Sequence, residues 1–259
     1  MKSSAIQLSV VIITLDEERN IERCIRSVQS VADEIVVVDS YSTDRTKEIC
    51  QSLGVRFIEN PFVDFVQQKN FALDSTAHEY VLSLDADEAL SEALCQEIAA
   101  IKDNYQHDAY RFHRLTSYCG QWIRHSGWYP DAKLRLWKKS VGRWGGSGIH
   151  ESVILNETAV VKTVKKDILH YSYHSVQDHI TQLNKFSGMS AAAYHRQGKK
   201  VFPLFHWVVY PLITFVSRYL FKLGFLDGPM GYVVCRSAAQ AKYLKYLKLY
   251  ELKRRAPNP

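Results

Sequence analysis

Glycine is absent from the first 53 residues of this 259-residue chain, where Gly54 is the first to occur. The turn after the first predicted strand, residues 8–14, therefore contains neither GxGxxG nor GxxxxGK[ST]. Such loops bring backbone amides against the phosphates of dinucleotides and nucleoside triphosphates. Their absence disfavours a dinucleotide oxidoreductase, a P-loop enzyme and a nucleotidyltransferase, although the last class also uses carboxylates and a metal ion on an α/β sheet.

Paired cysteines and an export signal are also missing. The five cysteines form no CxxC pair and no metal-binding spacing. The first apolar run, residues 10–13, is too short for the hydrophobic region of a signal peptide. We therefore expect reduced thiols in the cytoplasm. The sequence has no internal repeat and no low-complexity segment.

The net positive charge of the chain comes from its C-terminal quarter. Residues 196–259 carry 12 Lys or Arg against 2 Asp or Glu, a net charge of +10, whereas the preceding 195 residues carry 21 against 25, a net charge of −4. Long apolar runs interrupt the basic residues, which favours an anionic membrane surface over nucleic acid as the partner.

The first hundred residues alternate between short apolar runs and helical patterns. Buried strands are predicted at 8–14, 34–39, 55–58 and 80–84, and the helices between and after them at 21–28, 42–53, 65–75 and 91–101. This alternation predicts an α/β fold with a Rossmann-like, mostly parallel sheet and right-handed crossovers.

Carboxylates follow three of the predicted strands. Asp16 and Glu17 come after Thr14, Asp39 ends the second strand, and the fourth strand ends in a DxD motif, Asp85-Ala86-Asp87. Parallel strand ends meet at one edge of a sheet, where ligands bind, and hard carboxylate oxygens suit Mg²⁺ or Mn²⁺. In the alternative interpretation, the DxD pair only caps the turn and the next helix. Convergence of three strand ends favours a ligand site.

A second region, beyond residue 101, is rich in aromatic residues. Aromatic faces with polar tips suit sugar rings, and the alternative is the aromatic core of a small antiparallel lobe. The glycines of residues 144–149 precede His150 and Glu151, which predicts a mobile lid carrying a titratable group. His170 is either a third metal ligand beside the aspartates or a packed core residue. The aromatic residues are Tyr110, Phe112, Tyr118, Trp122, Trp128, Tyr129, Trp137 and Trp144.

The remainder of the chain is predicted to be helical and amphipathic. Residues 201–217 lack formal charge, but their prolines and His206 make them marginal as a membrane span and favour a helix in the membrane interface. There, Trp207 and Tyr210 would lie at headgroup depth while Arg218 and Lys222 snorkel. Within a predicted helix at 238–255, three lysines form either a basic stripe for anionic lipid or an ordinary solvated face: Lys242, Lys245 and Lys248.

Five segments together resemble the inverting glycosyltransferases of family 2, which have the GT-A fold: VVIITLDEERNI, IVVVDSYSTDRT, QQKNFAL, LSLDADE and GIHE. The GFLDG turn and basic tail further resemble bacterial lipopolysaccharide inner-core β-glucosyltransferases. The resemblance implies a GT-A domain at 1–175, with a nucleotide-binding half at 8–101 and an acceptor-binding half at 102–175. Residues 176–259 would form a membrane-associating tail. Asp16 departs from the Asn of many relatives, which bears on base contacts in the nucleotide pocket.

The resemblance also assigns roles to individual residues. Asp39 would lie near the base and ribose, Asp85 would reach the ribose or a metal-bound water, and Asp87 would ligate the divalent metal. The other residues implied in the nucleotide pocket are Thr14, Glu17 and Lys69.

The transfer reaction also requires a base on the acceptor side. An acceptor hydroxyl must lose a proton as it attacks the anomeric carbon, and Glu151, supported by His150, is the predicted base. Lys69 and Arg135 are expected to neutralise the diphosphate, unless Arg135 is a structural surface residue.

These residues predict transfer of a sugar, glucose above all, from a UDP-sugar to a heptose of the lipopolysaccharide inner core on a lipid-linked acceptor. We expect the enzyme at the cytoplasmic face of the bacterial inner membrane, as a peripheral protein. The alternatives are a polyprenyl phosphate or protein acceptor, or a non-catalytic sugar-nucleotide-binding membrane protein.

Overall fold

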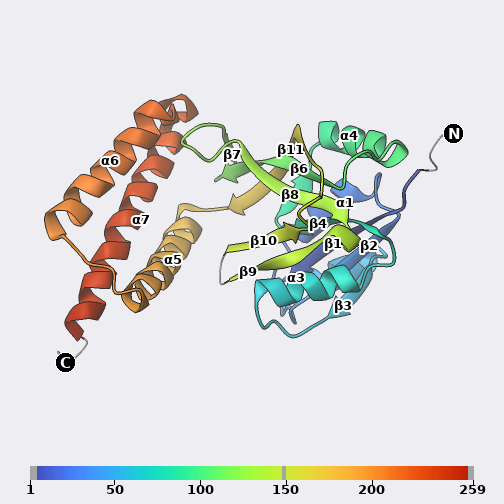
Figure 1. Cartoon of the computed structure of the whole chain (residues 1–259), viewed down its shortest axis with the longest axis horizontal. Coiled ribbons are helices and arrows are strands. Elements are labelled where there is room, and N and C mark those ends of the chain that lie inside the picture. The colour runs from blue at the N-terminus through green and yellow to red at the C-terminus, as the bar shows by residue number, and fades with distance from the viewer. Residues whose placement is uncertain (1–4, 148–149, 256–259) are drawn as a thin grey trace. The chain divides into compact units, whose positions relative to one another are not determined.

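A computed structural model describes residues 5–147 and 150–255, and it describes the side chains of these residues except for Ser147 and His150. The chain divides into two compact units (Figure 1). The first unit contains Met1–Leu115 and Asp131–Tyr171, and the second contains Thr116–Pro130 and Ser172–Pro259. Strands β6 (Ala109–Tyr118) and β11 (Val161–Tyr173) contribute residues to both units.

Strands and helices alternate through the first half of the first unit, as the sequence predicts. Each of the four predicted strands lies within one residue of its expected bounds. The order along the chain is β1 (Leu8–Thr14), α1 (Ile21–Val28), β2 (Glu34–Asp39), α2 (Thr46–Ser52), β3 (Arg56–Glu59), α3 (Phe65–Asp74), β4 (Tyr80–Asp85), β5 (Glu88–Leu90) and α4 (Glu92–Asp103).

The sheet is parallel on one side and antiparallel on the other. Its order is β3-β2-β1-β4-β8-β6-β11-β5, with β8 formed by Asp131–Lys138, and the first four strands are parallel. β8 joins β4 in antiparallel register, and β9 (Gly142–Ser147) and β10 (His150–Leu155) form a separate hairpin. The predicted α/β fold of the GT-A type is confirmed, and antiparallel strands extend its parallel half.

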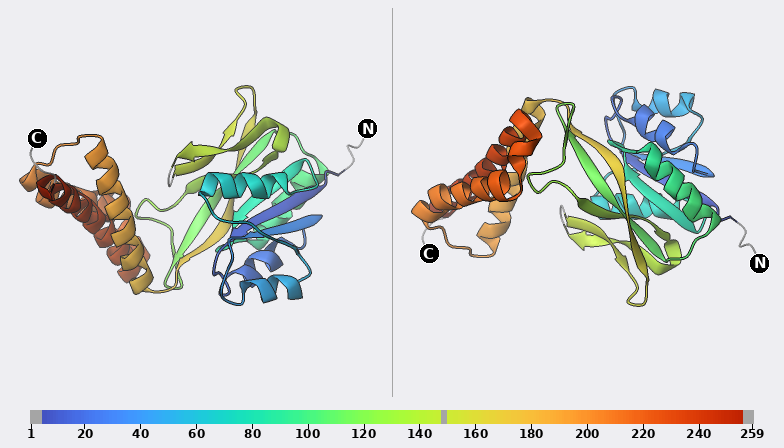
Figure 2. Two further views of the ribbon diagram at one scale, coloured as in Figure 1. Left: turned by 90° about the horizontal axis from the view of Figure 1, so that it is seen from below. Right: turned by 90° about the horizontal axis from the view of Figure 1, so that it is seen from above.

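Alternate residues of the central strands pack into different cores on the two faces of the sheet. Val10 and Ile12 of β1 belong to a core with residues of α1 and α4, whereas Val11 packs with Leu73 of α3 and with Trp137. The views in Figure 2 accordingly show α1 and α2 on one face of the parallel strands and α3 on the other. Burial on both faces explains the continuous β-branched runs of β1 and β2.

Helices dominate the second unit. The longest, α7 (Gly228–Arg255), packs against both α5 (Val176–Arg196) and α6 (Tyr210–Val216), as Figure 1 shows. The other elements are β7 (Gln121–Ile123), the π-helices η2 (Leu204–Val209) and η3 (Ser217–Phe221), and the 3-10 helix η4 (Gly224–Asp227). α7 begins ten residues before the expected position 238, because Pro229 is compatible with a first helical turn.

Residues 204–221 form one continuous helical segment, which is long and apolar enough to cross a membrane. Pro211 does not interrupt it, although this proline lies where the π-helix Leu204–Val209 passes into α6. The apolar side chains of this segment are largely exposed. They include Leu204, Phe205, Val208, Leu212, Ile213, Leu220 and Phe221.

Trp207 and Tyr210 are half-buried, with their rings 5.1 Å and 6.0 Å from the rings of Tyr250 and Tyr246 of α7, and their expected headgroup depth stays a prediction. One expectation for this segment is wrong. Arg218 does not snorkel outward, because its Nη1 donates a hydrogen bond to the carbonyl of Ser126 at 2.9 Å.

The lysines of α7 do not form an exposed basic stripe either. Lys245 is buried, with its ammonium 4.2 Å from the ring centroid of Tyr194. Lys248 donates hydrogen bonds to Asn184 and Ser187 of α5. Neither lysine lies on an ordinary solvated face, since the two side chains turn toward the neighbouring helix.

Candidate active site

The ends of β1, β2 and β4 lie in register at one edge of the sheet. Thr14 is paired with Asp39, and Ile13 with Asp85. The convergence of polar strand ends expected from the sequence is therefore present. The buried hydroxyl oxygen of Thr14 has no hydrogen-bond partner among the described residues, so a polar atom at this edge is left for a ligand.

Asp39 and Asp16 hold two loops together at this edge. The buried carboxylate of Asp39 accepts hydrogen bonds from the amide and the hydroxyl of Ser42. The same Ser42 hydroxyl oxygen accepts the amide hydrogen of Asp16 at 2.8 Å, and Asp16 Oδ1 accepts from the amide of Thr43 at 2.7 Å. Asp16 has a φ of +52°, a conformation that Asp and Asn tolerate better than most residues. The departure from Asn at this position is thus compatible with the loop.

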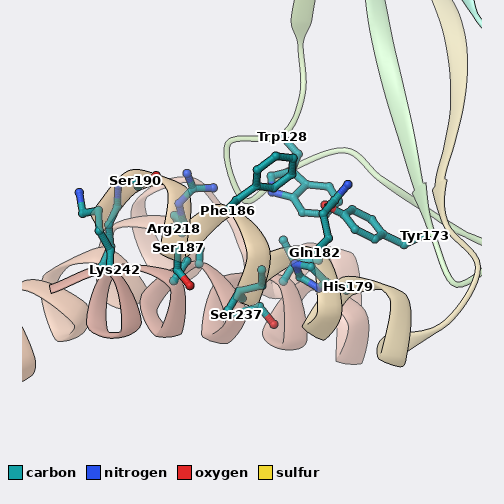
Figure 3. Close-up of a pocket in the computed structure, with 15 residues that line it drawn as sticks. Trp128, Tyr173, His179, Gln182, Phe186, Ser187, Ser190, Arg218, Ser237 and Lys242 are labelled. Atoms are coloured by element: carbon teal, nitrogen blue, oxygen red, sulfur yellow. The ribbon is translucent and has the colours of Figure 1, made fainter. Parts of the chain in front are cut away.

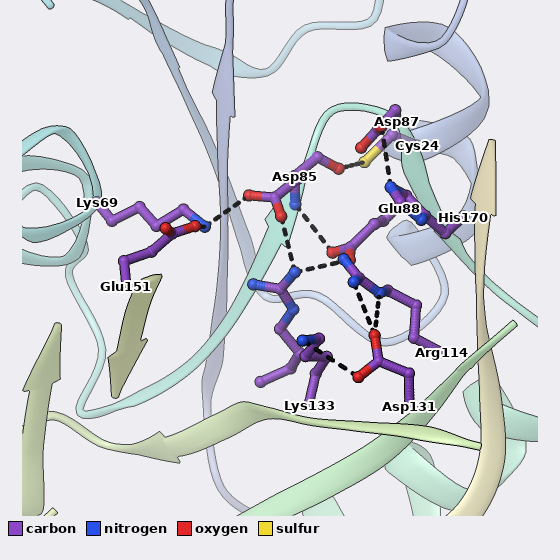
Figure 4. Close-up of polar contacts among 11 residues, drawn as sticks. Cys24, Lys69, Asp85, Asp87, Glu88, Arg114, Asp131, Lys133, Glu151 and His170 are labelled. Atoms are coloured by element: carbon purple, nitrogen blue, oxygen red, sulfur yellow. Dashed lines mark hydrogen bonds and ion pairs between the residues drawn. The ribbon is translucent and has the colours of Figure 1, made fainter. Parts of the chain in front are cut away.

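The first aspartate of the DxD motif lies between two buried cations (Figure 4). Lys69 Nζ is 2.9 Å from Asp85 Oδ1, and Arg135 Nη2 is 2.7 Å from Asp85 Oδ2. Lys69 is 2% exposed and Arg135 is 3% exposed, so Arg135 is not the surface residue considered above. Burial raises the pKa of Asp85, but the charges of Arg135 and Lys69 outweigh it and hold the pKa well below its usual range.

Glu151 joins this cluster from the hairpin. Its Oε1 lies 3.2 Å from Lys69 Nζ, so one ammonium contacts both the DxD motif and the predicted base. Glu151 belongs to β10, where it is paired with Gly146 of β9. Its side chain remains 21% exposed and can meet a substrate.

The glycine stretch differs from the lid that the sequence predicts, because Gly145 and Gly146 lie within β9. A Cβ atom on Gly145 would lie 2.3 Å from Cδ1 of Ile154, an exposed side chain that would have to move to make room. The rest of the predicted lid, residues 148–149, lies outside the described residues. The same holds for the side chain of His150, whose supporting role stays a prediction.

The second aspartate of the DxD motif is paired with His170. Asp87 Oδ2 lies 3.1 Å from His170 Nε2, and the amide of Tyr171 donates to the Asp87 carbonyl at 2.8 Å. His170 reaches this position because β11 runs antiparallel to β5, with His170 opposite Glu88. The two predicted metal ligands are therefore adjacent in space.

Glu17 lies in the electrostatic field of this pair. The pKa of Glu17 is raised to about 7, because burial and the charge of Asp87 together outweigh the lowering effect of a hydrogen bond from Asn20. Glu17 is thus poised to carry a proton near neutral pH when no cation is present.

The donor set of Asp87 and His170 fits a divalent cation. Across residues 5–147 and 150–255, no group of three or more His, Cys, Asp or Glu side chains is placed to hold a metal. The carboxylate of Asp87 is the kind of oxygen donor that Mg²⁺ and Mn²⁺ prefer, and a site with so few protein donors leaves most coordination positions to water and phosphate oxygens.

Sequence reasoning missed Glu88 as part of the cluster. Glu88 is buried, accepts from Arg135 Nη2 at 2.6 Å, lies 3.4 Å from Arg114 Nη1, and accepts the amide of Asp85 at 3.1 Å. It fixes the turn that carries the DxD motif. The only signal was the third carboxylate of LSLDADE.

The aromatic region is largely core. Tyr110, Phe112, Tyr118, Trp137 and Trp144 are all buried, which supports the alternative of an aromatic core for these residues. The ring of Trp144 also lies 4.4 Å from Lys69 Nζ and helps to hold that ammonium.

Comparison with known proteins gives a consistent result. Residues 9–152 match the family Glycosyl transferase family 2. An uncharacterized glycosyltransferase of Rickettsia typhi is 32% identical over 97% of this chain and 89% of its own length. The lipopolysaccharide core biosynthesis glycosyltransferase LpsC of Rhizobium meliloti is 29% identical over 94% of this chain and 92% of its own.

Solved structures are more distant. TarS of S. aureus, residues 1–349, is 14% identical with a TM-score of 0.45, over 96% of this chain and 91% of that one. Glucosyl-3-phosphoglycerate synthase of Mycobacterium tuberculosis, solved with Mn²⁺, UDP and glucosyl-3-phosphoglycerate, is 23% identical with a TM-score of 0.37, over 42% and 44%. With more than half of its sequence matching the family and a relative above 30% identity along nearly its whole length, the chain belongs to glycosyl transferase family 2 and is a glycosyltransferase.

Proposed function

We propose that this glycosyltransferase moves glucose from UDP-glucose to a heptose of the lipopolysaccharide inner core on a lipid-linked acceptor. The observation that carries the proposal is the position of Lys69, whose ammonium contacts both Asp85 and Glu151. This contact joins the end of a central strand, where a donor binds in α/β sheets, to a carboxylate on a separate hairpin. A donor site and an acceptor base are thereby within reach of one substrate pair.

The strand ends provide the contacts for a nucleotide donor. Thr14 offers an unpartnered hydroxyl, and Asp39 lies beside it in register. Glu17 lies in the field of the DxD motif from the loop after β1. Asp85, fixed by two cations, is oriented to accept hydrogen bonds from a ribose or from a metal-bound water.

Asp87 and His170 would hold the divalent metal, Mg²⁺ or Mn²⁺. When bound, the metal would supply positive charge to the diphosphate leaving group. Lys69 and Arg135 add two further buried cations within the same cluster, although their present partners are carboxylates.

Glu151 is the group that would take the proton. As the acceptor hydroxyl attacks the anomeric carbon, a carboxylate oxygen of Glu151 accepts its hydrogen, and the bond to the diphosphate breaks. A single displacement with one base inverts the anomeric centre, so an α-linked donor gives a β-glycoside. Trp144 shields Lys69 from solvent on the side of β9.

The relationship to LpsC supports an acceptor in the lipopolysaccharide core. An apolar helical surface next to a basic tail supports an acceptor that is anchored in lipid. We accordingly place the protein at the cytoplasmic face of the bacterial inner membrane, as a peripheral protein on anionic lipid. A polyprenyl phosphate or a protein would be the acceptor if core heptose is not used.

The experiment is a calorimetric titration of the full-length chain with UDP, UDP-glucose and UDP-galactose, each with and without Mn²⁺. Metal-dependent binding, tightest for UDP-glucose, is the expected result. Tighter binding of UDP-galactose than of UDP-glucose would make UDP-galactose the donor in place of UDP-glucose. If none of the three bound, the proposed donor class would be overturned, and the non-catalytic interpretation would be favoured.

A further inference from the structure

The second unit contains a cavity of about 280 Å³ that lies wholly within it (Figure 3). Its walls come from α5, α7, η3 and the segment that carries Trp128. Apart from the aromatic and basic residues treated below, the lining consists largely of small and polar side chains: Gln182, Ser187, Ser190, Ser237, Ala238 and Ala241.

The cavity is strongly cationic. Arg218, Lys242 and Lys245 all line it, and none of the lining residues is acidic. Lys245 is only 8% exposed, and within the described part of the chain no carboxylate lies at ion-pair distance from it. A buried ammonium of this kind requires a counter-charge or polar partners, because its transfer from water into the protein interior costs free energy.

Aromatic rings compensate Lys245 only in part. Its Nζ lies 4.2 Å and 4.6 Å from the ring centroids of Tyr194 and Tyr246. Such contacts stabilise a desolvated ammonium less than an anion in direct contact with it does. The cavity therefore holds a buried cation whose natural counter-charge is a ligand.

The donors around this cation match a phosphate group. Arg218 uses one guanidinium hydrogen on the carbonyl of Ser126, which leaves four others, and the residue lines the cavity. Ser190 on α5 adds a hydroxyl group, whereas the Ser187 hydroxyl already donates to the carbonyl of Asn184. Arginine, lysine and serine together are the typical ligands of phosphate oxygens in proteins.

The other end of the cavity is aromatic and uncharged. In Figure 3, Trp128 and Tyr173 lie at the end opposite Lys242 and Ser190. His179 belongs to this end, where burial lowers its pKa and the hydroxyl of Tyr118 lies 3.0 Å from its Nδ1. A ligand with an anionic end and a ring or apolar end fits this division.

We propose that this cavity binds the phosphate ester of an amphiphile, with the phosphate held by Arg218, Lys242 and Lys245. The ring or apolar part of the ligand then lies against Trp128 and Tyr173 at the other end of the cavity. The inference deepens the proposed function and rests on it only where the amphiphile is equated with the lipid-linked acceptor. Binding itself requires no donor sugar and no transfer.

The test is vesicle binding by the full-length chain. Phosphatidylcholine vesicles with and without phosphatidic acid are sedimented with the wild-type protein, with Lys245→Met and with Lys253→Met. Both variants remove one positive charge from α7, but Lys253 does not line the cavity. We expect Lys245→Met to weaken binding to phosphatidic acid at least tenfold, while Lys253→Met stays within about twofold of the wild type. An equal loss in both variants would overturn the proposal in favour of general surface charge.

A second variant covers the case in which Lys245→Met does not fold. Lys242 is half-buried, so Lys242→Gln is expected to keep the thermal unfolding midpoint and still weaken binding severalfold. Unchanged binding by Lys242→Gln would contradict the proposed phosphate site.

Soluble probes separate the possible sources of the phosphate. Titration with inorganic phosphate and glucose 6-phosphate should give much weaker binding than phosphatidic acid vesicles. Binding of glucose 6-phosphate that depends on Lys245, without any preference for phosphatidic acid, would overturn the amphiphile. Metal-dependent UDP binding is measured on the same variants, so failure of this proposal is distinguishable from failure of the donor site.

Discussion

Lys69 Nζ lies 2.9 Å from Asp85 Oδ1, and the lysine side chain is 98% buried while the aspartate side chain is 27% exposed. The ammonium is thus enclosed by protein, and its carboxylate partner reaches the surface where a donor would bind. The pair links the stability of the first unit to the geometry of its candidate active site.

Replacing Lys69 by methionine is expected to destabilise the protein by about 3 kcal/mol, because Asp85 and Glu151 would lose a buried counter-charge. Chemical denaturation measures this loss. The matched control is Lys47→Met, which breaks an exposed ion pair with Glu59 and should cost less than about 1 kcal/mol. Similar losses for the two variants would show that the buried ion pair stabilises the protein no more than the exposed pair does.

Asp87→Ala is expected to abolish the metal dependence of UDP binding, since it removes the oxygen of the only His–Asp pair proposed to hold the cation. Calorimetric titration with and without Mn²⁺ measures the effect. Glu22→Ala, on the exposed side of α1, is the control and should bind as the wild type does. If Asp87→Ala kept its metal dependence, the assignment of the metal ligands would be wrong.

Glu151→Gln is expected to leave donor binding within about threefold of the wild type while lowering the transfer rate by roughly 10² to 10⁴, the usual contribution of a general base. Transfer is measured as release of UDP in the presence of acceptor. Glu157→Gln, at an exposed turn after β10, changes the same chemical group and should have no effect. Substantial transfer by the Glu151 variant would place the base elsewhere.

Glu17 predicts a pH dependence of stability in the absence of divalent metal. Its pKa is raised to about 7 in the folded protein from 4.5, so the folded state binds the extra proton. The resulting stability is present in full below pH 4.5 and is lost as pH rises through 7. Glu17→Gln should remove about 1 to 3 kcal/mol of this dependence between pH 5 and 8, measured by urea unfolding at each pH. Parallel profiles for wild type and variant would contradict the raised pKa.

Phe221→Asp is expected to reduce binding to anionic vesicles severalfold, because this side chain is 80% exposed on the apolar helical segment. Co-sedimentation measures the bound fraction. Val160→Asp, which is 57% exposed on the first unit, introduces the same charge away from that surface and should bind normally. Equal loss in the two variants would point to a general effect of negative charge.

The parallel half of the sheet could be predicted because its signals are local. β1 and β2 are uninterrupted runs of buried, β-branched residues, and each run sets its own bounds. The meeting of Thr14, Asp39 and Asp85 followed from topology alone, since parallel strands end at a common edge. The contact between Asp87 and His170 did not follow from this topology, because it depends on the antiparallel pairing of β11 with β5.

Other features had no local signal. Glu88 and Arg135 are far apart in sequence, and only the packing of β8 beside β4 makes them an ion pair. The lysines of α7 were expected at a surface because lysine is rarely buried, but rings from α5 and α7 enclose Lys245. Helical spacing shows which residues share a face and does not show what covers that face.

The Ser42 hydroxyl has a consequence for attempts to change the donor. Because it accepts from the amide of Asp16 and donates to Asp39, while Asp16 Oδ1 accepts from the amide of Thr43, the loops that follow β1 and β2 are held to one another by several hydrogen bonds. Neither loop can adopt a new backbone path while the other keeps its own. Under the proposed function, exchanging the donor preference with that of a relative therefore means transplanting residues 15–20 and 40–46 together.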